Sequence, residues 1–418
     1  MDVLAEPGMD TPIVVDHWPA AQRSWRVAMV TETWPPEVNG VALTVARLVD
    51  GLRERNHALQ LIRPRQTRGD DAAQPGNGLH EVLLRGLPVP RYPHLKMGVP
   101  SKRRLVALWT LHRPDVVHIA TEGPLGWSAL QAAAVLKLPV VSDFRTNFHA
   151  YSQHYGLGWL KKPIVAYLRK FHNRTHCTMV PTEGLRRELA EAGFQQLRVV
   201  ARGVDTRHFN PLKRSAALRM QWGADAGTRV LLCVGRLAPE KNLGLLIEAY
   251  QAMRQVDPAL KLVLVGDGPA RETLRAACPD ALFTGVRAGD DLAAHYASAD
   301  FFLFPSLTET FGNVVPEAMA SGLAVLAFEH AAAGELIRWG DNGLVVPPDR
   351  PGAYIAAAVQ LARDRALGPR LGRQACATVS RLGGEQVVQR VEAEYAAAVA
   401  AGPRLQRASP FLPRPKPG

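Results

Sequence analysis

Short apolar runs bounded by glycine and proline alternate with helix-like segments along most of the 418 residues, and this series occurs twice in the chain. Runs that are apolar throughout, rather than at every second position, are typical of strands buried on both faces. Parallel sheets covered by helices on both sides have this pattern. The sequence therefore predicts an α/β protein of two Rossmann-like, doubly wound domains that face each other across a cleft.

The second series begins after Asn210 and Pro211. We expect an N-terminal domain at 25–208, a C-terminal domain at 209–384, a last helix at 385–400 that returns to the first domain, and tails at 1–24 and 403–418. Strands are predicted at 25–31, 59–63, 115–119, 140–144, 230–234, 262–265, 281–283, 301–304 and 324–328, and helices at 41–55, 105–111, 125–136, 243–253, 292–297 and 314–320.

Other features of the composition indicate where such a protein works. No apolar run reaches the roughly 18 residues that a membrane-spanning helix needs. The first 24 residues carry four acidic side chains and lack the apolar centre of a signal peptide. The four cysteines stand too far apart for a CxxC metal or redox motif. We therefore expect a cytoplasmic protein in a reducing compartment.

The positive charge is concentrated in the N-terminal half. Residues 1–208 contain 27 Lys and Arg against 18 Asp and Glu, a net +9 of the total +12. Such an excess favours an anionic partner, although it can equally serve solubility. The cluster Lys102–Arg104 and the segment 159–171, which mixes aromatic, aliphatic and basic residues, suggest peripheral binding to the inner face of an anionic membrane. The alternative is that Ile164, Leu168 and Phe171 belong to the domain core.

Ligands of open α/β sheets bind beyond the carboxyl ends of the strands. In the C-terminal half, Arg236 and Lys241 follow the strand at 230–234 and would suit a diphosphate, or form an exposed basic turn. Gly266 lies in a glycine loop after the next strand, where a ligand contact and a tight turn are equally good interpretations. Glu309 and Glu317 flank the start of a helix, where carboxylates can accept hydrogen bonds from sugar hydroxyls or remain solvated.

Two loops of the N-terminal half carry weaker signals. Residues 33–40 join the first strand to a helix and end in Gly40, which would allow a phosphate to approach the helix N-terminus. The loop lacks the GxGxxG pattern of dinucleotide folds and can also be a structural turn. Arg145 and His149 follow the strand at 140–144 and would face the cleft, or serve as structural hydrogen-bond donors. His118, within a strand, is more typical of a buried core histidine.

Taken together, these loops resemble the retaining GT-B glycosyltransferases of the family 4 / group 1 type. Within it, the likeness is strongest to bacterial GDP-mannose-dependent alpha-mannosyltransferases and sulfoquinovosyl/glycolipid synthases. It covers about residues 25–400. The motifs that carry it are Pro35-Pro36 with Asn39-Gly40, Gly203-Val204-Asp205, Phe209-Asn210-Pro211, Gly235-Arg236 with Lys241, Gly266-Asp267-Gly268-Pro269, the pair Glu309 and Glu317, and Asn342-Gly343-Leu344.

The resemblance implies a role for each site residue. Arg236 and Lys241 would neutralise the departing diphosphate, Glu309 would hold the transferred hexose, and Glu317 would hold the ribose hydroxyls. The donor site would further include Asn39, Gly40, Gly266, Val286 at the base, and the Phe311, Gly312 and Asn313 amides. No metal or cofactor is implied; the nucleotide sugar, GDP-mannose or a UDP-hexose, is a substrate. The acceptor would be a lipid or glycan hydroxyl.

One residue departs from the family pattern. Many members have a Phe-His-Thr triplet at the cleft, whereas this chain has Phe144-Arg145-Thr146. Arginine cannot act as a base. Arg145 would therefore bind and orient, and any histidine role would pass to another side chain such as His149.

Three alternatives stay open. The same fold could use UDP-glucose or UDP-glucuronate to make a glycolipid, or it could be an epimerase or a phosphorylase-like enzyme that holds pyridoxal phosphate. The isoelectric point near 9.8 would also fit a nucleic-acid-binding protein. That class is disfavoured because no helix-turn-helix, RRM or zinc signature is present and because it leaves Glu309 and Glu317 without a role.

Overall fold

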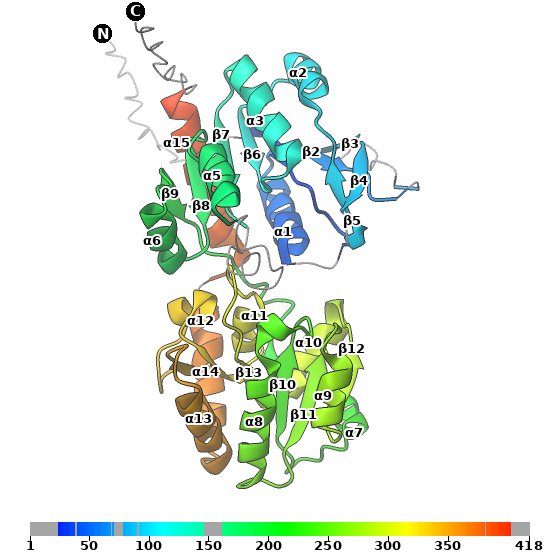
Figure 1. Ribbon diagram of the computed structural model, residues 1–418, viewed down its shortest axis with the longest axis vertical. Helices are drawn as coiled ribbons and strands as arrows, with labels where there is room; N and C mark the ends of the chain where they lie inside the picture. Colours follow the sequence, from blue (N-terminus) through cyan, green and yellow to red (C-terminus); the bar gives the residue numbers. More distant parts are fainter. Residues whose placement is uncertain are drawn as a thin grey trace, which may run out of the picture.

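A computed structural model describes residues 24–37, 40–67, 69–70, 78–89, 92–145, 161–380 and 382–402. Its two halves lie one above the other, as Figure 1 shows. The N-terminal half consists of β1 (Arg26–Val30), α1 (Gly40–Glu54), β2 (Ala58–Pro64), β3 (Leu79–Leu84), β4 (Gly86–Val89), β5 (Tyr92–Gly98), α2 (Lys102–Leu111), β6 (Val116–Ile119), α3 (Pro124–Leu136), β7 (Val140–Asp143), α5 (Lys161–His172), β8 (Cys177–Val180), α6 (Glu183–Glu191) and β9 (Leu197–Val199).

The C-terminal half repeats the alternation of strands and helices. Its elements are η2 (Pro211–Lys213), α7 (Ala216–Gln221), β10 (Val230–Val234), η3 (Pro239–Lys241), α8 (Leu243–Arg254), β11 (Lys261–Val265), α9 (Arg271–Ala277), β12 (Leu282–Gly285), α10 (Gly289–Ser298), β13 (Phe301–Phe304), α11 (Val314–Ala320), β14 (Ala324–Phe328), α12 (Ala331–Leu336), β15 (Leu344–Val346), α13 (Pro351–Arg363) and α14 (Leu367–Val379), and a final helix α15 (Gly384–Ala401) follows.

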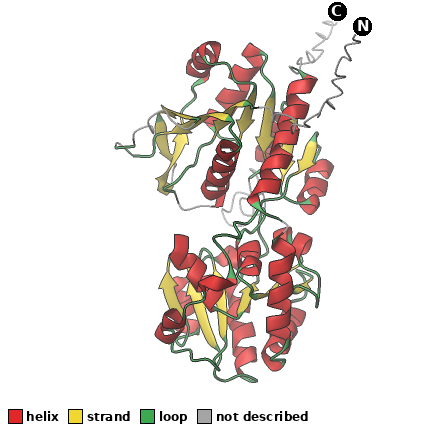
Figure 2. Cartoon of the chain, turned by 180° about the vertical axis from the view of Figure 1, so that it is seen from behind, coloured by secondary structure: helices red, strands yellow, loops and turns green. Residues whose placement is uncertain are grey.

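Each half contains one parallel sheet. The N-terminal sheet has the strand order β3-β2-β1-β6-β7-β8-β9, and the C-terminal sheet has the order β12-β11-β10-β13-β14-β15. In both sheets the order reverses beside the first strand, between β1 and β6 and between β10 and β13. A ligand crevice is expected at such a switch point. The predicted pair of doubly wound domains is confirmed, and helices lie on both sides of each sheet (Figure 2).

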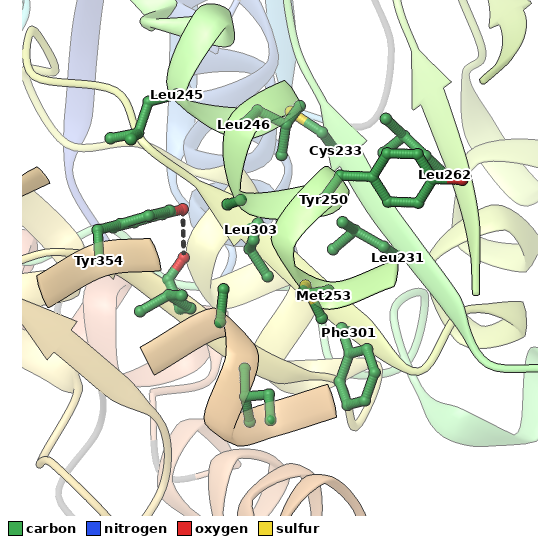
Figure 3. Packing of buried hydrophobic residues seen from close by; sticks show 14 of the residues in the cluster. Leu231, Cys233, Leu245, Leu246, Tyr250, Met253, Leu262, Phe301, Leu303 and Tyr354 are labelled. Carbon is green, nitrogen blue, oxygen red and sulfur yellow. Dashed lines mark hydrogen bonds between the residues drawn. The ribbon is translucent and has the colours of Figure 1, made fainter. Parts of the chain in front are cut away.

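The continuous apolar runs are explained by burial on both sides of the sheets. Along β10, Leu231 and Cys233 belong to one hydrophobic cluster, whereas Val230 and Leu232 belong to another. Figure 3 shows the first cluster, where α8 and α13 meet the sheet and the Tyr354 hydroxyl donates to the carbonyl oxygen of Leu326. Because both faces are covered, the carboxyl ends of the strands are the natural place for polar groups.

The final helix α15 lies in the N-terminal half, although α14 before it belongs to the C-terminal half (Figure 1). It packs against α1, β6 and β7. Glu392 pairs with Arg55 and His57, and the Tyr395 hydroxyl lies 2.7 Å from Nδ1 of the buried His118. This helix therefore ties the end of the chain to the centre of the N-terminal sheet.

Candidate active site between the two sheets

The two predicted phosphate-binding cations lie just beyond the carboxyl end of β10. Lys241 forms an ion pair with Glu309 and lies over the ring of Phe304, 5.7 Å from its centroid. Arg236 pairs with Glu240, and its side chain is 54% exposed. One cation is thus held beside a site carboxylate, and the other stands at the surface.

Glu309 is the centre of the local contacts. Its Oε1 accepts hydrogen bonds from Lys241 and from the Ser306 hydroxyl at 2.8 Å. Its main-chain oxygen accepts from Nε2 of His330 at 3.2 Å. The loops after β10, β13 and β14 therefore meet at this glutamate. The structure brings together Lys241 and Glu309, two predicted site residues that are 68 positions apart in the sequence.

Glu317 occupies a different environment. It lies in the first part of α11, is buried, and accepts a hydrogen bond from the Tyr296 hydroxyl at 3.1 Å. Burial raises the pKa of its carboxyl group from 4.5 to about 7, although the charge of Arg47 on α1 and the bond from Tyr296 oppose the shift. The alternative of a solvated glutamate does not fit this residue.

Glycines let the loops of the C-terminal half lie close together. Gly266 has a φ of +132°, and a Cβ there would collide with the main-chain oxygen of Gly235. A Cβ at Gly268 would collide with the main-chain oxygen of Leu237. Gly312 has a φ of +83°, a conformation that L side chains rarely adopt. At Gly266, packing between neighbouring loops is a sufficient reason for glycine.

The N-terminus of α1 meets the start of α11 across the two halves. Gly40 is the first residue of α1, and a Cβ there would lie 3.5 Å from Nδ2 of Asn313. The same amide lies 3.4 Å from the Thr44 hydroxyl, one turn further along α1. Phe311 is buried in the core, so only its main chain remains to meet a ligand. These contacts place the predicted phosphate-binding helix end opposite the Phe311–Asn313 loop.

Arg145 is nearly buried at the end of β7, with 7% of its side chain exposed. Its guanidinium forms an ion pair with Asp143, and its main-chain N–H lies 3.4 Å from Glu122. Nε2 of His118 lies 3.1 Å from the same Asp143 carboxylate. Burial opposes ionisation of Asp143, yet Arg145 and His118 hold the pKa of its carboxyl group below the ordinary value.

Arg202, which sequence reasoning overlooked, completes the cluster of charges. It lies in the connection between the halves, 5.6 Å over the ring of Phe311. Burial, reinforced by the charge of Arg145, lowers its pKa to about 9, and Asp143 and Glu309 oppose this shift. Its position directly before the Gly203-Val204-Asp205 motif is the only sequence signal that could have drawn attention to it.

Two cavities open onto some of these residues. One, of about 500 Å³, lies between Thr182–Glu188 of the N-terminal half and Glu309, Thr310 and residues 329–338 of the C-terminal half. Another, of about 800 Å³, is lined by Arg145 and Arg202 and extends along α1 and α15. Glu309 therefore borders the first cavity, and Arg145 and Arg202 border the second.

Three predicted positions contribute no observed contact. Asn39 and His149 lie outside the described residues. Val286 follows β12 and is 60% exposed. Within the described ranges, no group of three or more His, Cys, Asp and Glu side chains is placed to hold a metal ion, and no helix is long and apolar enough to cross a membrane.

Two family descriptions match most of the chain. Residues 38–208 match "Glycosyltransferase Family 4", and residues 228–364 match "Glycosyl transferases group 1". A Mycobacterium tuberculosis protein named GDP-mannose-dependent alpha-mannosyltransferase is 37% identical over 325 residues, which cover 77% of this chain and 84% of that protein. The sulfoquinovosyl transferase SQD2 of Arabidopsis thaliana is 28% identical over 380 residues, 88% of this chain and 72% of that protein.

Solved structures show the same fold. Sucrose-phosphate synthase from Thermosynechococcus elongatus superposes with a TM-score of 0.76 at 20% identity, over 90% of this chain and 100% of that one. The Anabaena protein HepE in complex with UDP-glucose gives a TM-score of 0.69 at 19% identity, over 89% of this chain and 100% of that one. The two doubly wound halves have the GT-B fold. This chain belongs to the family 4 / group 1 glycosyltransferases and is a hexosyltransferase that uses a nucleotide sugar.

Proposed function

We propose that this enzyme transfers mannose from GDP-mannose to a hydroxyl group of a lipid or glycan acceptor, with retention of configuration and without a metal ion. The observation that carries the proposal is the contact of Lys241 with Glu309, which joins a cation suited to diphosphate to a carboxylate suited to sugar hydroxyls. Three relatives at 33–37% identity are named GDP-mannose-dependent alpha-mannosyltransferases, which supports this donor.

Donor binding exchanges the partners of the charged groups. Lys241 turns from Glu309 to the diphosphate, and the freed Glu309 carboxylate accepts hydrogen bonds from the hexose. Arg236, which is exposed, swings onto the diphosphate from the solvent side. Glu317 accepts the ribose hydroxyls, and the amide of Gly40 closes over the phosphates from the other half. Each group thus has one partner in the free enzyme and another in the complex.

The reaction breaks the bond between the anomeric carbon and the diphosphate oxygen and forms a bond from that carbon to the acceptor oxygen on the same face. The acceptor proton passes to an oxygen of the departing diphosphate. Negative charge that develops there is stabilised by Lys241 and Arg236, and a contact of this kind contributes about 10²–10³ in rate. Arg145 stays protonated and orients the reactants.

The acceptor side is supported by a cavity of about 960 Å³ in the N-terminal half. The rings of Trp127 and Tyr167 form part of its wall, with centroids 5.6 Å apart and planes tilted by 40°. The exposed cluster Lys102–Arg104 borders it, and Glu122, beside Arg145, also lines it. Aromatic walls with a basic border suit a lipid whose head group lies at an anionic surface. Peripheral membrane binding is part of the proposal for this reason.

One element expected at the membrane has another role. Leu168 and Phe171 of α5 are buried, and Ile164 packs against the same domain core. Of the two interpretations of 159–171, the described part, α5, fits the core helix, because its apolar face packs inside the protein. Lys162, Arg169 and Lys170 remain exposed and can contribute charge only.

A donor and acceptor panel tests the proposal. GDP, UDP and ADP are first compared by thermal shift; a ligand at 100 times its Kd raises stability by about 2.7 kcal/mol. Sugar release and transfer are then measured with GDP-mannose, UDP-glucose and UDP-glucuronate, with and without diacylglycerol glycolipids. We expect stabilisation by GDP and an α-linked mannolipid. Selective stabilisation by UDP would favour UDP-glucose or UDP-glucuronate as the donor, as in the glycolipid alternative. An absorbance band of bound pyridoxal phosphate would reject the proposed transfer from a nucleotide sugar.

A further inference from the structure

A chain of buried polar groups connects the final helix to the cleft. Tyr395 on α15 lies against His118 on β6, His118 lies against Asp143 at the end of β7, and Asp143 binds Arg145. Tyr395, His118 and Asp143 are all buried. Because these groups are withdrawn from water, each needs its neighbour to satisfy its hydrogen-bonding capacity.

The charge of Asp143 determines which atoms donate and which accept along this series of buried polar groups. Arg145 keeps Asp143 ionised, so this carboxylate can only accept hydrogen bonds. Nε2 of His118 lies 3.1 Å from this carboxylate, within ion-pair distance but outside hydrogen-bond geometry, and it is the ring nitrogen that faces an acceptor and so carries the proton. In the neutral ring Nδ1 is then an acceptor, and the Tyr395 hydroxyl donates to it at 2.7 Å. The hydroxyl of Tyr395 thus selects the tautomer that donates to Asp143.

Arg145 depends on this carboxylate more than an exposed arginine would. Its Nε lies 3.0 Å from Asp143, and its Nη1 has no hydrogen-bond partner among the described residues. Arg202 is close enough for the two positive charges to act on each other. Without a fixed Asp143, repulsion between the two guanidinium groups would drive Arg145 from its place.

We propose that Tyr395 and His118 are positioning residues that act through Asp143 to hold the guanidinium of Arg145 in the reactive cleft. The final helix thereby takes part in the chemistry at the carboxyl end of β7. The helix is well placed for this role, because Glu392, one turn from Tyr395, is anchored by Arg55 and His57. This inference rests on the proposed function of Arg145 as a residue that orients the reactants.

The first test removes one hydroxyl group and requires no substrate. Tyr395→Phe is compared with Tyr354→Phe, which removes an equally buried hydroxyl that donates to Leu326 in the other half. In protein labelled with ¹⁵N-arginine, the Nε–H signal of Arg145 is identified by its loss in Arg145→Lys. We expect Tyr395→Phe to shift this signal and speed its exchange with water, and Tyr354→Phe to leave it unchanged. An unchanged signal in Tyr395→Phe would overturn the proposal, whether or not the enzyme uses GDP-mannose.

The second test separates positioning from folding. With the donor identified by the nucleotide panel, Tyr395→Phe should lower kcat about threefold to tenfold, the usual size for one buried hydrogen bond, while the Kd of the nucleoside diphosphate stays the same. His118→Gln, whose amide can still donate to Asp143, should retain more activity than His118→Leu. Equal loss in these two His118 variants, or equal effects of Tyr395→Phe and Tyr354→Phe on kcat, would show a structural role only.

Discussion

On the C-terminal side of the cleft, charged groups are held by residues of the same or a neighbouring loop, whereas on the N-terminal side the local pair of Asp143 and Arg145 is also tied to distant parts of the chain. Arg236 pairs with Glu240, four residues away, and Ser306 donates to Glu309, three residues away. By contrast, Asp143 is held through His118 by Tyr395, and His118 and Tyr395 are 277 positions apart. One side of the site is built from motifs and the other from a network.

This difference has a consequence for function. Local loops on a shared sheet edge are positioned by a rigid scaffold and can keep one geometry for the nucleotide and the transferred sugar. A network spread over β6, β7 and α15 ties the acceptor side to the packing of the whole N-terminal half. We therefore expect substitutions on the C-terminal side to change donor binding and transfer directly. Substitutions on the N-terminal side should act by moving Arg145 or by changing the charge of the protein surface.

The largest effect is expected for Glu309→Gln. The amide cannot pair with Lys241 or accept as strongly from sugar hydroxyls, so transfer should fall by about 10²–10³ with the fold intact. The measurement is single-turnover transfer with the donor identified by the panel, with folding checked by thermal unfolding. Glu272→Gln, an exposed glutamate on α9, is the control and should be neutral. Near-normal turnover in Glu309→Gln would break the comparison, because the C-terminal loops would then not hold the reacting sugar.

The second prediction concerns the buried Glu317. Its folded pKa of about 7 lies above the usual 4.5, so the folded state holds the proton more tightly than the unfolded state does. Its contribution to stability is therefore complete below pH 4.5 and is lost as pH rises to about 7, a decline on the order of 3 kcal/mol. Glu317→Gln, which can still accept from Tyr296, should lack this decline.

Urea denaturation between pH 4.5 and 8 measures the effect of Glu317→Gln. Nucleotide affinity should move in the opposite direction, rising towards pH 8 in the wild type as the carboxylate forms and staying flat in the variant. Parallel stability profiles of wild type and variant would mean that Glu317 is ionised throughout, and a flat affinity profile in the wild type would remove it from the ribose site.

The third prediction sharpens the N-terminal side of the comparison. Replacing Lys102, Arg103 and Arg104 with glutamine should lower binding to anionic vesicles by on the order of 100-fold at low salt, since each basic residue at such a surface contributes about 1 kcal/mol. The matched control replaces Arg363, Arg365 and Arg373, three exposed cations of the C-terminal half, and should bind normally. Equal binding to neutral and anionic vesicles would sink the membrane proposal and favour a soluble glycan acceptor.

The sequence predicts buried, local features of the fold better than features that depend on distant contacts. Strands such as Val230–Val234 and Phe301–Phe304 lie where predicted, because burial on both faces makes their sequences apolar throughout. The hairpin β4–β5 and the edge strands β3, β9 and β15 were not predicted, because these segments are short or contain polar residues and lack long apolar runs. The direction of the apolar face of α5 was also undecided, since an amphipathic helix looks the same against a core and against a membrane.

The site shows this division more sharply. The loops with Arg236, Lys241, Glu309 and Glu317 could be recognised because each motif is short and lies at a strand end. His118 was expected to be a buried histidine, and it is buried, but its partners could not be named. They depend on strand order, which places β6 beside β7, and on a helix from the far end of the chain. No motif or spacing in the sequence indicates that His118 lies beside Asp143 and Tyr395.

The smallest expected effect is that of metal removal. Transfer should be unchanged in EDTA, because Lys241 and Arg236 supply the positive charge that the departing diphosphate needs. In the free enzyme the nearest carboxylates pair with these cations, Glu309 with Lys241 and Glu240 with Arg236, and in the proposed complex Glu309 turns to the hexose rather than to a metal ion. Lys241→Gln serves as the matched comparison and should lose about 10²-fold in rate, a loss that added Mg²⁺ does not restore. Activity that vanishes in EDTA and returns with Mg²⁺ or Mn²⁺ would contradict this prediction. Lys241 and Arg236 would then not suffice to neutralise the diphosphate, and the donor site would include a metal ion held by other groups.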